Sequence, residues 1–203
     1  MSELTNTILI TASKLMQKFG ISSVTMDDIA KECHISKRTL YEHIPDKRTL
    51  VWNSVLFNKE KKQTEVKKLL QEAPSTLAAL LHIYRYMRGS FTESTSIFFK
   101  DMHRLYPDIE KKCREFHREQ AESLGAFLTK GVDEGMFRTD INFATAADVF
   151  TVQASSIMKE LSTTNELKTV QNMIDTAFVI FLRGIATHKG LEIIDEFLKE
   201  NNI

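Results

Sequence analysis

A cluster of hydrogen-bond donors and positive charges lies between residues 36 and 47, around one short predicted helix. The side chains of this cluster are those of Ser36, Lys37, Arg38, Thr39, Tyr41, His43 and Lys47. Three of them fall in the first helical turn, where unpaired backbone N–H groups also point outward. Donors and cations on a free helix N-terminus suit phosphate oxygens and base edges, so we expect this segment to contact DNA.

The donors predict different kinds of contact. The side chains expected to hold phosphates are Lys37, Tyr41 and Lys47. Arg38 can bind guanine through two hydrogen bonds, which provide about 1–3 kcal/mol of discrimination against other bases. Three hydroxyls either contact DNA or only cap helices, and these belong to Thr25, Ser36 and Thr39.

Two N-cap signals position this cluster. Thr25 precedes an apolar-periodic segment and Asp28 follows three residues later, which is the spacing of a capping box. Helical periodicity continues to Cys33, and Ser36 is the next N-cap candidate. One helix therefore ends, about three residues pass and another begins, which is the spacing of a helix-turn-helix.

The flanking segments complete a three-helix domain. Residues 4–19 form an amphipathic helix that ends at Gly20 and packs across the next two helices. Pro45 stops the third helix, and Asp46 is placed to cap a longer one over residues 46–71. A lysine in the first turn opposes the helix dipole, so Lys47 indicates a phosphate nearby.

Residues 8–50 resemble the N-terminal DNA-binding domain of the TetR family of transcriptional regulators, in its TetR/AcrR-like form. The matching positions are Ile8, Leu9, Ala12, Leu15, Gly20, Thr25, Ile29, Ala30, Ile35, Ser36, Thr39, Leu40, Tyr41, Lys47 and Leu50. The sequence departs from the family pattern at His34, Ile44 and Asp46. His34 replaces the usual turn glycine and is expected to adopt a positive φ. The resemblance implies a helix-turn-helix domain at residues 1–46 and a helical ligand-binding and dimerisation domain at residues 47–203.

Composition favours an all-α protein. Only 7 Gly and 3 Pro occur among 203 residues, and most fall between periodic segments. No apolar run reaches about 18 residues, and the N-terminus lacks the basic start of a signal peptide, so we expect a cytoplasmic protein without membrane contact. Residues 1–70 carry 12 Lys and Arg against 8 Asp and Glu, whereas residues 71–203 carry 15 against 19. This asymmetry has the sign expected of a DNA-facing N-terminal end.

Further helices are predicted over residues 76–91, 97–105, 107–134, 142–161, 165–187 and 191–200, with a polar break at residues 92–96. The helices at 142–161 and 165–187 are apolar on more than one side. Such helices need two interfaces, one with the protein's own core and one with a partner. We therefore expect a homodimer with a four-helix interface, which the family resemblance also implies.

The middle of the chain combines aromatic side chains with a few polar groups. Candidate contacts for a small-molecule effector are Tyr86, Phe99, Met102, His103, Phe116, His117, Gln120 and Phe150. Ordinary core packing explains most of these residues equally well, and their interpretation as a cavity depends on the resemblance. A metal site is the alternative, because Cys113 and His117 lie one helical turn apart near His103, but two or three ligands do not complete the usual set. We expect neither a metal nor a cofactor.

The sequence contains no nucleophile elbow, phosphate-binding glycine loop or zinc-protease motif, so we do not expect an enzyme. The favoured function is a DNA-binding transcriptional regulator, a repressor that a small apolar or amphipathic effector releases from a palindromic operator. The alternative is a helical ligand-binding or adaptor protein whose DNA-binding domain is vestigial. The effector, the operator sequence and the role of the helix at 191–200 do not follow from the sequence.

Overall fold

The computed structural model describes residues 2–89, 93–163 and 166–201, with the side chains of residues 93–95, 117–122, 158 and 161–163 left outside the description. The described residues form ten α-helices and no strand, apart from an isolated antiparallel bridge between Phe137 and Ala186. The all-α prediction is therefore confirmed. None of the helices in the described ranges is long and apolar enough to cross a membrane.

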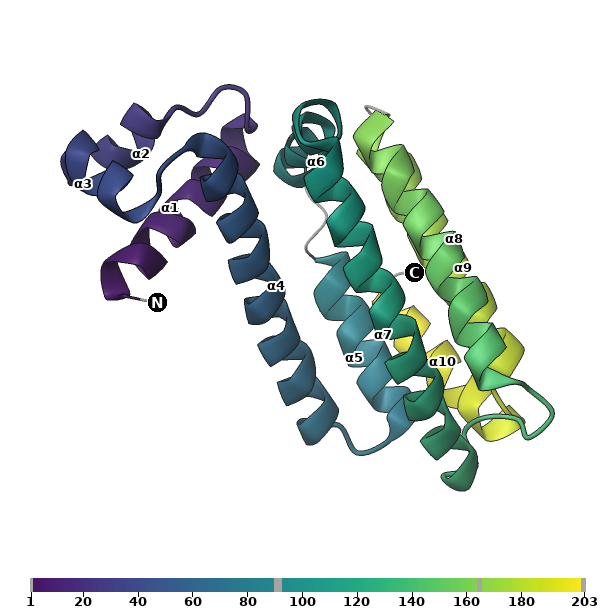
Figure 1. The fold of residues 1–203 in the computed structure, drawn as a ribbon. Coiled ribbons are helices and arrows are strands. Elements are labelled where there is room, and N and C mark those ends of the chain that lie inside the picture. Colours follow the sequence, from purple (N-terminus) through teal and green to yellow (C-terminus); the bar gives the residue numbers. More distant parts are fainter. Residues whose placement is uncertain (1, 90–92, 164–165, 202–203) are drawn as a thin grey trace. The chain divides into compact units, whose positions relative to one another are not determined.

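The first compact unit consists of Met1–Glu65 and Thr92–Glu110. It contains α1 (Glu3–Phe19), α2 (Met26–Glu32), α3 (Lys37–His43), the first part of α4 (Lys47–Glu72) and α6 (Glu93–Leu105). Figure 1 shows α1, α2 and α3 grouped beside the start of α4. The buried apolar side chains of the first unit include Ile8, Leu9, Ala12, Met16, Ile29, Leu40, Ile44, Leu50, Val51 and Met102.

The second compact unit consists of Val66–Phe91 and Lys111–Ile203. It contains α5 (Thr76–Arg88), most of α7 (Pro107–Asp133), α8 (Phe143–Thr163), α9 (Leu167–Ile185) and α10 (His188–Glu200). Helices α8 and α9 lie side by side (Figure 1). The core of this unit is formed by α5, α7, α8, α9, α10 and the loop after α7, around buried side chains such as Leu77, Tyr84, Leu128, Phe137 and Phe178.

Local capping chemistry explains most helix starts. The backbone N–H of Thr49 donates to Asp46 Oδ1 at 2.7 Å, and that of Ala78 donates to Ser75 Oγ at 3.1 Å. Asn142 Oδ1 accepts from the Thr145 N–H at 3.0 Å, and Pro107 is the first residue of α7. The cap at Asp46 was predicted from residue type and spacing, and the helix starts predicted at residues 76, 107 and 142 fall within one residue of the observed starts.

Three predicted boundaries differ from the structure by three residues or more. Helix α6 already begins at Glu93, so the described part of the predicted polar break at residues 92–96 is helical. The segment contains polar residues but no glycine or proline, and polar side chains alone do not stop a helix. Helix α5 ends at Arg88 rather than near Phe91, which lies outside the described residues. Helix α10 begins at His188 rather than 191, because Thr187 Oγ1 caps it by accepting from the Gly190 N–H at 3.2 Å.

The compact units do not divide the chain at residue 46. Their boundary falls inside α4, after Glu65, and again inside α7, after Glu110. The first unit also takes in α6, which packs against α1 although the two helices are far apart in sequence. The functional division into residues 1–46 and 47–203 stays a prediction, since it concerns which segment binds DNA and which binds an effector.

Candidate DNA-binding site

The turn between α2 and α3 sets the direction of the recognition helix. His34 has a φ of 53°, as predicted from its place where a glycine is usual. The N–H of His34 donates to the Lys31 carbonyl at 3.1 Å, and the N–H of Ile35 donates to the Ala30 carbonyl at 3.0 Å. These bonds close the end of α2, and the N-cap of α3, Ser36, follows two residues after His34.

The hydroxyls near both helix starts act as caps. Ser36 Oγ accepts from the Thr39 N–H at 3.0 Å and lies 2.8 Å from Thr39 Oγ1. At α2, Thr25 Oγ1 accepts from the Asp28 N–H at 3.1 Å, while Asp28 Oδ2 accepts from the Thr25 N–H at 2.8 Å. The Thr25 hydroxyl and N–H together lower the pKa of the Asp28 carboxyl. Thr25, Ser36 and Thr39 therefore hold the helix-turn-helix in shape, whatever further contact they make with DNA.

Helix α3 buries one face and exposes its cations on the other. Leu40 and the following Ile44 are 0% and 1% exposed, whereas the Arg38 side chain is 90% exposed. Arg38 Nε donates to Glu42 Oε1 at 3.0 Å, and Lys37 Nζ lies 2.7 Å from Asp27 Oδ1. The hydrogen bond to Asp27 also raises the pKa of Lys37. Both cations are thus on the surface, but each is held by a neighbouring acid.

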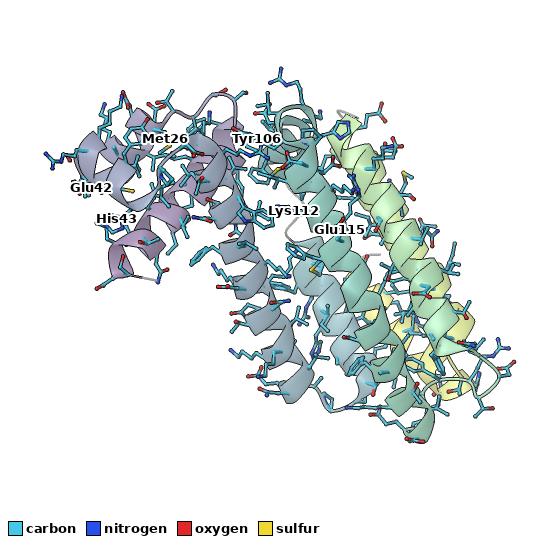
Figure 2. The ribbon with its side chains drawn as sticks, viewed as in Figure 1. Met26, Glu42, His43, Tyr106, Lys112 and Glu115 are labelled. Carbon is cyan, nitrogen blue, oxygen red and sulfur yellow. The ribbon has the colours of Figure 1, made fainter. Side chains whose placement is uncertain are left out.

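Tyr41 and His43 extend the exposed face of α3. Tyr41 is 41% exposed, which leaves its ring accessible. His43 Nδ1 lies 3.0 Å from Thr5 Oγ1, so this imidazole joins the end of α3 to the first turns of α1. Figure 2 shows His43 and Glu42 on α3. His43 therefore has a structural contact besides its predicted role at DNA.

Lys47 lies in the first turn of α4 and is half-buried. Burial lowers the pKa of its ammonium group, while Asp101 and Asp28 act in the opposite direction. Asp101 comes from α6, and sequence reasoning did not assign it to this site. No local pattern could have found it, because its partner Ser22 is 79 residues away in the chain.

We predict that Asp27→Asn strengthens DNA binding by about fivefold, since a change of about 1 kcal/mol corresponds to this factor. The substitution frees Lys37 from its carboxylate and removes a negative charge close to the incoming phosphates. Exposed ion pairs contribute little to folding, so stability should hardly change. Titration of a labelled duplex at fixed salt measures the effect. Asp140→Asn is the matched control, because it breaks the equally exposed pair with Arg138 in the second unit. Unchanged or weaker binding by Asp27→Asn would contradict the prediction.

The predicted effector contacts are distributed over both compact units. Phe99, Met102 and His103 belong to α6 of the first unit, and Met102 is only 2% exposed. His103 Nδ1 lies 3.0 Å from Glu110 Oε2. The second unit contains Tyr86, Phe116 and Phe150. The side chains of His117 and Gln120 lie outside the described residues.

Packing accounts for one of these aromatic residues directly. The Phe150 ring stacks on Phe181 with centroids 4.5 Å apart. An open hollow of about 560 Å³ is lined by residues of α7 and α8 such as Gly125, and another of about 570 Å³ by residues of α8 and α9 such as Met173. None of the predicted effector residues whose side chains the structure describes lines either hollow. The effector site stays a prediction.

The geometry of the described residues does not support the alternative of a metal site at Cys113, His117 and His103. Among the side chains that the structure describes, no group of three or more His, Cys, Asp or Glu residues could hold an ion. His103 pairs with Glu110, and the His117 side chain is not described.

Comparison with known proteins agrees with the helix-turn-helix assignment. Residues 8–51 match the family model described as bacterial regulatory proteins, tetR family. No curated protein sequence matches the chain. A family of regulatory proteins also agrees with the expectation that the protein is not an enzyme.

Solved structures resemble the chain over nearly its whole length. A transcriptional regulator from Cytophaga hutchinsonii ATCC 33406 superposes with a TM-score of 0.74 at 19% identity, covering 89% of this chain and 97% of that chain. A TetR-family regulator from Agrobacterium tumefaciens gives a TM-score of 0.66 at 18% identity, covering 91% and 98%. A regulator from Saccharomonospora viridis in complex with choline gives 0.70 at 19% identity, covering 93% and 100%. Residues 8–51 therefore match the tetR family of bacterial regulatory proteins, and the chain shares its fold with these solved transcriptional regulators.

Proposed function

We propose that the protein is a transcriptional repressor that binds a palindromic operator through α3. The observation that carries this proposal is the capped first turn of α3, which exposes Lys37 and Arg38 opposite a face buried by Leu40. In a helix-turn-helix this is the turn that reaches base edges in the major groove. Arg38 would bind guanine, and Lys37, Tyr41 and Lys47 would bind phosphates.

The proposed repressor is a homodimer joined through α8 and α9. Large apolar side chains on these two helices are exposed in the single chain: Val149 is 63%, Val152 67%, Met173 40% and Ile180 64% exposed. An exposed apolar face of this kind marks an interaction surface. A second copy across a two-fold axis would cover it and present two α3 helices to major grooves about 34 Å apart.

The proposed signal is a small apolar or amphipathic effector bound by the helices that follow the DNA-binding segment. The Saccharomonospora viridis regulator with the same fold holds choline, which indicates that the fold accommodates small molecules. An effector can weaken operator binding only by its different affinities for the DNA-binding and non-binding states. As a regulator of bacterial transcription, the protein would act in the cytoplasm.

The experiment that tests the function begins with fragments of the source genome selected by the wild-type protein. The apparent Kd for a recovered duplex should fall steeply as salt is lowered, because lysine and arginine displace counterions from phosphates. Arg38→Ala together with Lys47→Ala should weaken binding by roughly 100-fold and reduce the salt dependence by about one phosphate.

The matched control replaces two other surface cations outside the first unit, Arg138→Ala with Lys199→Ala. This pair should leave the affinity for the duplex nearly unchanged. If the wild-type protein binds the duplex and the Arg38/Lys47 variant binds equally well with the same salt dependence, α3 does not carry the binding. The proposed operator contact through α3 would then be overturned, whereas failure of the wild-type protein to bind any duplex would favour the alternative of a helical ligand-binding or adaptor protein.

A further inference from the structure

Asp101 makes a buried connection between α6 and the turn that leads into α2. The residue is 7% exposed, and its Oδ2 atom accepts hydrogen bonds from the Ser22 N–H at 2.7 Å and the Ser22 hydroxyl at 2.8 Å. Arg104 Nη2 donates to Oδ1 at 3.0 Å. Although burial opposes the effect, these donors lower the pKa of Asp101, so the carboxylate is charged at neutral pH.

The same contact explains the glycine at the end of α1. Gly20 has a φ of 86°, and a Cβ atom added there would lie 2.8 Å from Asp101 Oδ2 and 2.9 Å from Ile97 Cγ2. The adjoining Ile21 and Val24 are 0% and 3% exposed. Helix α6 is therefore in close contact with the segment between α1 and α2 at Gly20 and Ser22.

A second contact joins the corner after α6 to the start of α4. The Arg48 guanidinium pairs with Asp108 and lies 5.9 Å from the centre of the Tyr106 ring. Tyr106 is labelled in Figure 2 at the junction of α6 and α7. Arg48 is next to Lys47, which we propose as a phosphate contact. Residues 101–108 thus contact both Ser22, which precedes α2, and Arg48, in the first turn of α4. All these residues belong to the first compact unit.

We propose that Asp101 is a positioning residue for DNA binding, which fixes the orientation of α2 and α3 by holding Ser22. This inference rests on the proposed DNA-binding function. Hydrogen bonds to a charged acceptor are stronger than those between neutral groups, and their loss would leave the Ser22 N–H without its acceptor on α6. Because α2 packs directly on α3, movement of the segment at Ser22 would displace the recognition helix.

Asp101 could affect DNA in the opposite way through its charge alone. Its electrostatic interaction with Lys47 shows that the carboxylate lies near a proposed phosphate contact. If repulsion of phosphates were its main effect, removing the charge would strengthen DNA binding. The positioning role predicts weaker binding, so the sign of the change separates the two explanations.

The test compares Asp101→Ala and Asp101→Asn with wild type. Affinity is measured for the selected duplex at a temperature where melting curves show every variant folded, and hydrogen exchange is measured without DNA over residues 20–35. Asp101→Ala should weaken binding about tenfold and speed exchange in this segment, as expected for the loss of a hydrogen-bonded charge. Asp101→Asn should keep the duplex affinity and the exchange rates close to those of wild type, because its amide oxygen can still accept hydrogen bonds from Ser22. Ser22→Ala removes only the hydroxyl donor and should have a smaller effect in the same direction.

Asp140→Ala is the matched control, since it removes an exposed carboxylate from the second unit and should leave both readouts unchanged. Unchanged affinity and exchange in Asp101→Ala would overturn the positioning role, and so would tighter binding by both Asp101 variants. If Asp101→Ala does not fold, Ser22→Ala still decides, because wild-type affinity and wild-type exchange in this variant would overturn the positioning role. Failure of the wild-type protein to bind any duplex would instead overturn the proposed function, while the exchange data would still show whether Asp101 holds the turn.

Discussion

Val152→Asp combined with Ile180→Asp is expected to yield a monomer and to weaken operator binding by 100-fold or more. Val152 on α8 and Ile180 on α9 are 67% and 64% exposed in the single chain, although both are large apolar side chains. Burying one such side chain in the interface stabilises the dimer by about 1.5–3 kcal/mol. A carboxylate buried there without a partner would destabilise the dimer by roughly several kcal/mol. A monomer brings one α3 helix to the operator and loses the gain from binding two half-sites together, which is roughly 10²- to 10⁴-fold.

The measurements are the molar mass in solution and the Kd for the selected duplex. The matched control is Leu70→Asp, which places the same charge on an apolar side chain that is 37% exposed on α4. The control should remain dimeric and bind the duplex as wild type does. A variant that keeps the dimer mass would place the dimer interface elsewhere. A monomer that binds the palindrome with undiminished affinity would remove dimerisation from the proposed mechanism.

The helix-turn-helix was predictable because its structure is set by neighbouring residues. Thr25 and Asp28 are three apart, Ser36 caps the helix that it precedes, and Asp46 caps the helix that follows Pro45. The positive φ of His34 was expected instead from the family resemblance, because His34 replaces the usual turn glycine. The capping contacts join residues three apart, so residue type and order determine them almost completely.

Contacts between distant segments were not predictable in this way. Ser22 gives no sign in sequence that a carboxylate from α6 will hold it. Phe150 is of a residue type that is common in ligand pockets, and in the structure its ring stacks on Phe181. Periodicity shows that a side chain is buried, and it does not show whether a ligand or another helix buries it.

Glycines inside helices are a second example of contacts that the sequence does not predict. Whether a helical position requires glycine depends on which side chains pack against it, and the sequence does not identify these side chains. Gly131 is in α7, and a Cβ atom there would lie 2.2 Å and 2.4 Å from two ring carbons of Phe137. Phe137 is 1% exposed and belongs to the core of the second unit. Gly184 is in α9, and a Cβ atom there would meet nothing within 4 Å. Two helical glycines of similar appearance in sequence therefore have opposite expected responses to substitution.

Gly131→Ala is expected to lower the free energy of unfolding by about 2 kcal/mol, because overpacking a core costs about 1–3 kcal/mol and exceeds the gain in helix propensity. Gly184→Ala should instead raise it by about 0.5–1 kcal/mol, since the methyl group has space and alanine favours the helix. Urea denaturation followed by circular dichroism measures both. Phe137→Leu should itself be destabilising, but Gly131→Ala should cost less in that background because the ring is gone. Equal costs in the two backgrounds would show that the Phe137 ring is not what requires glycine at position 131.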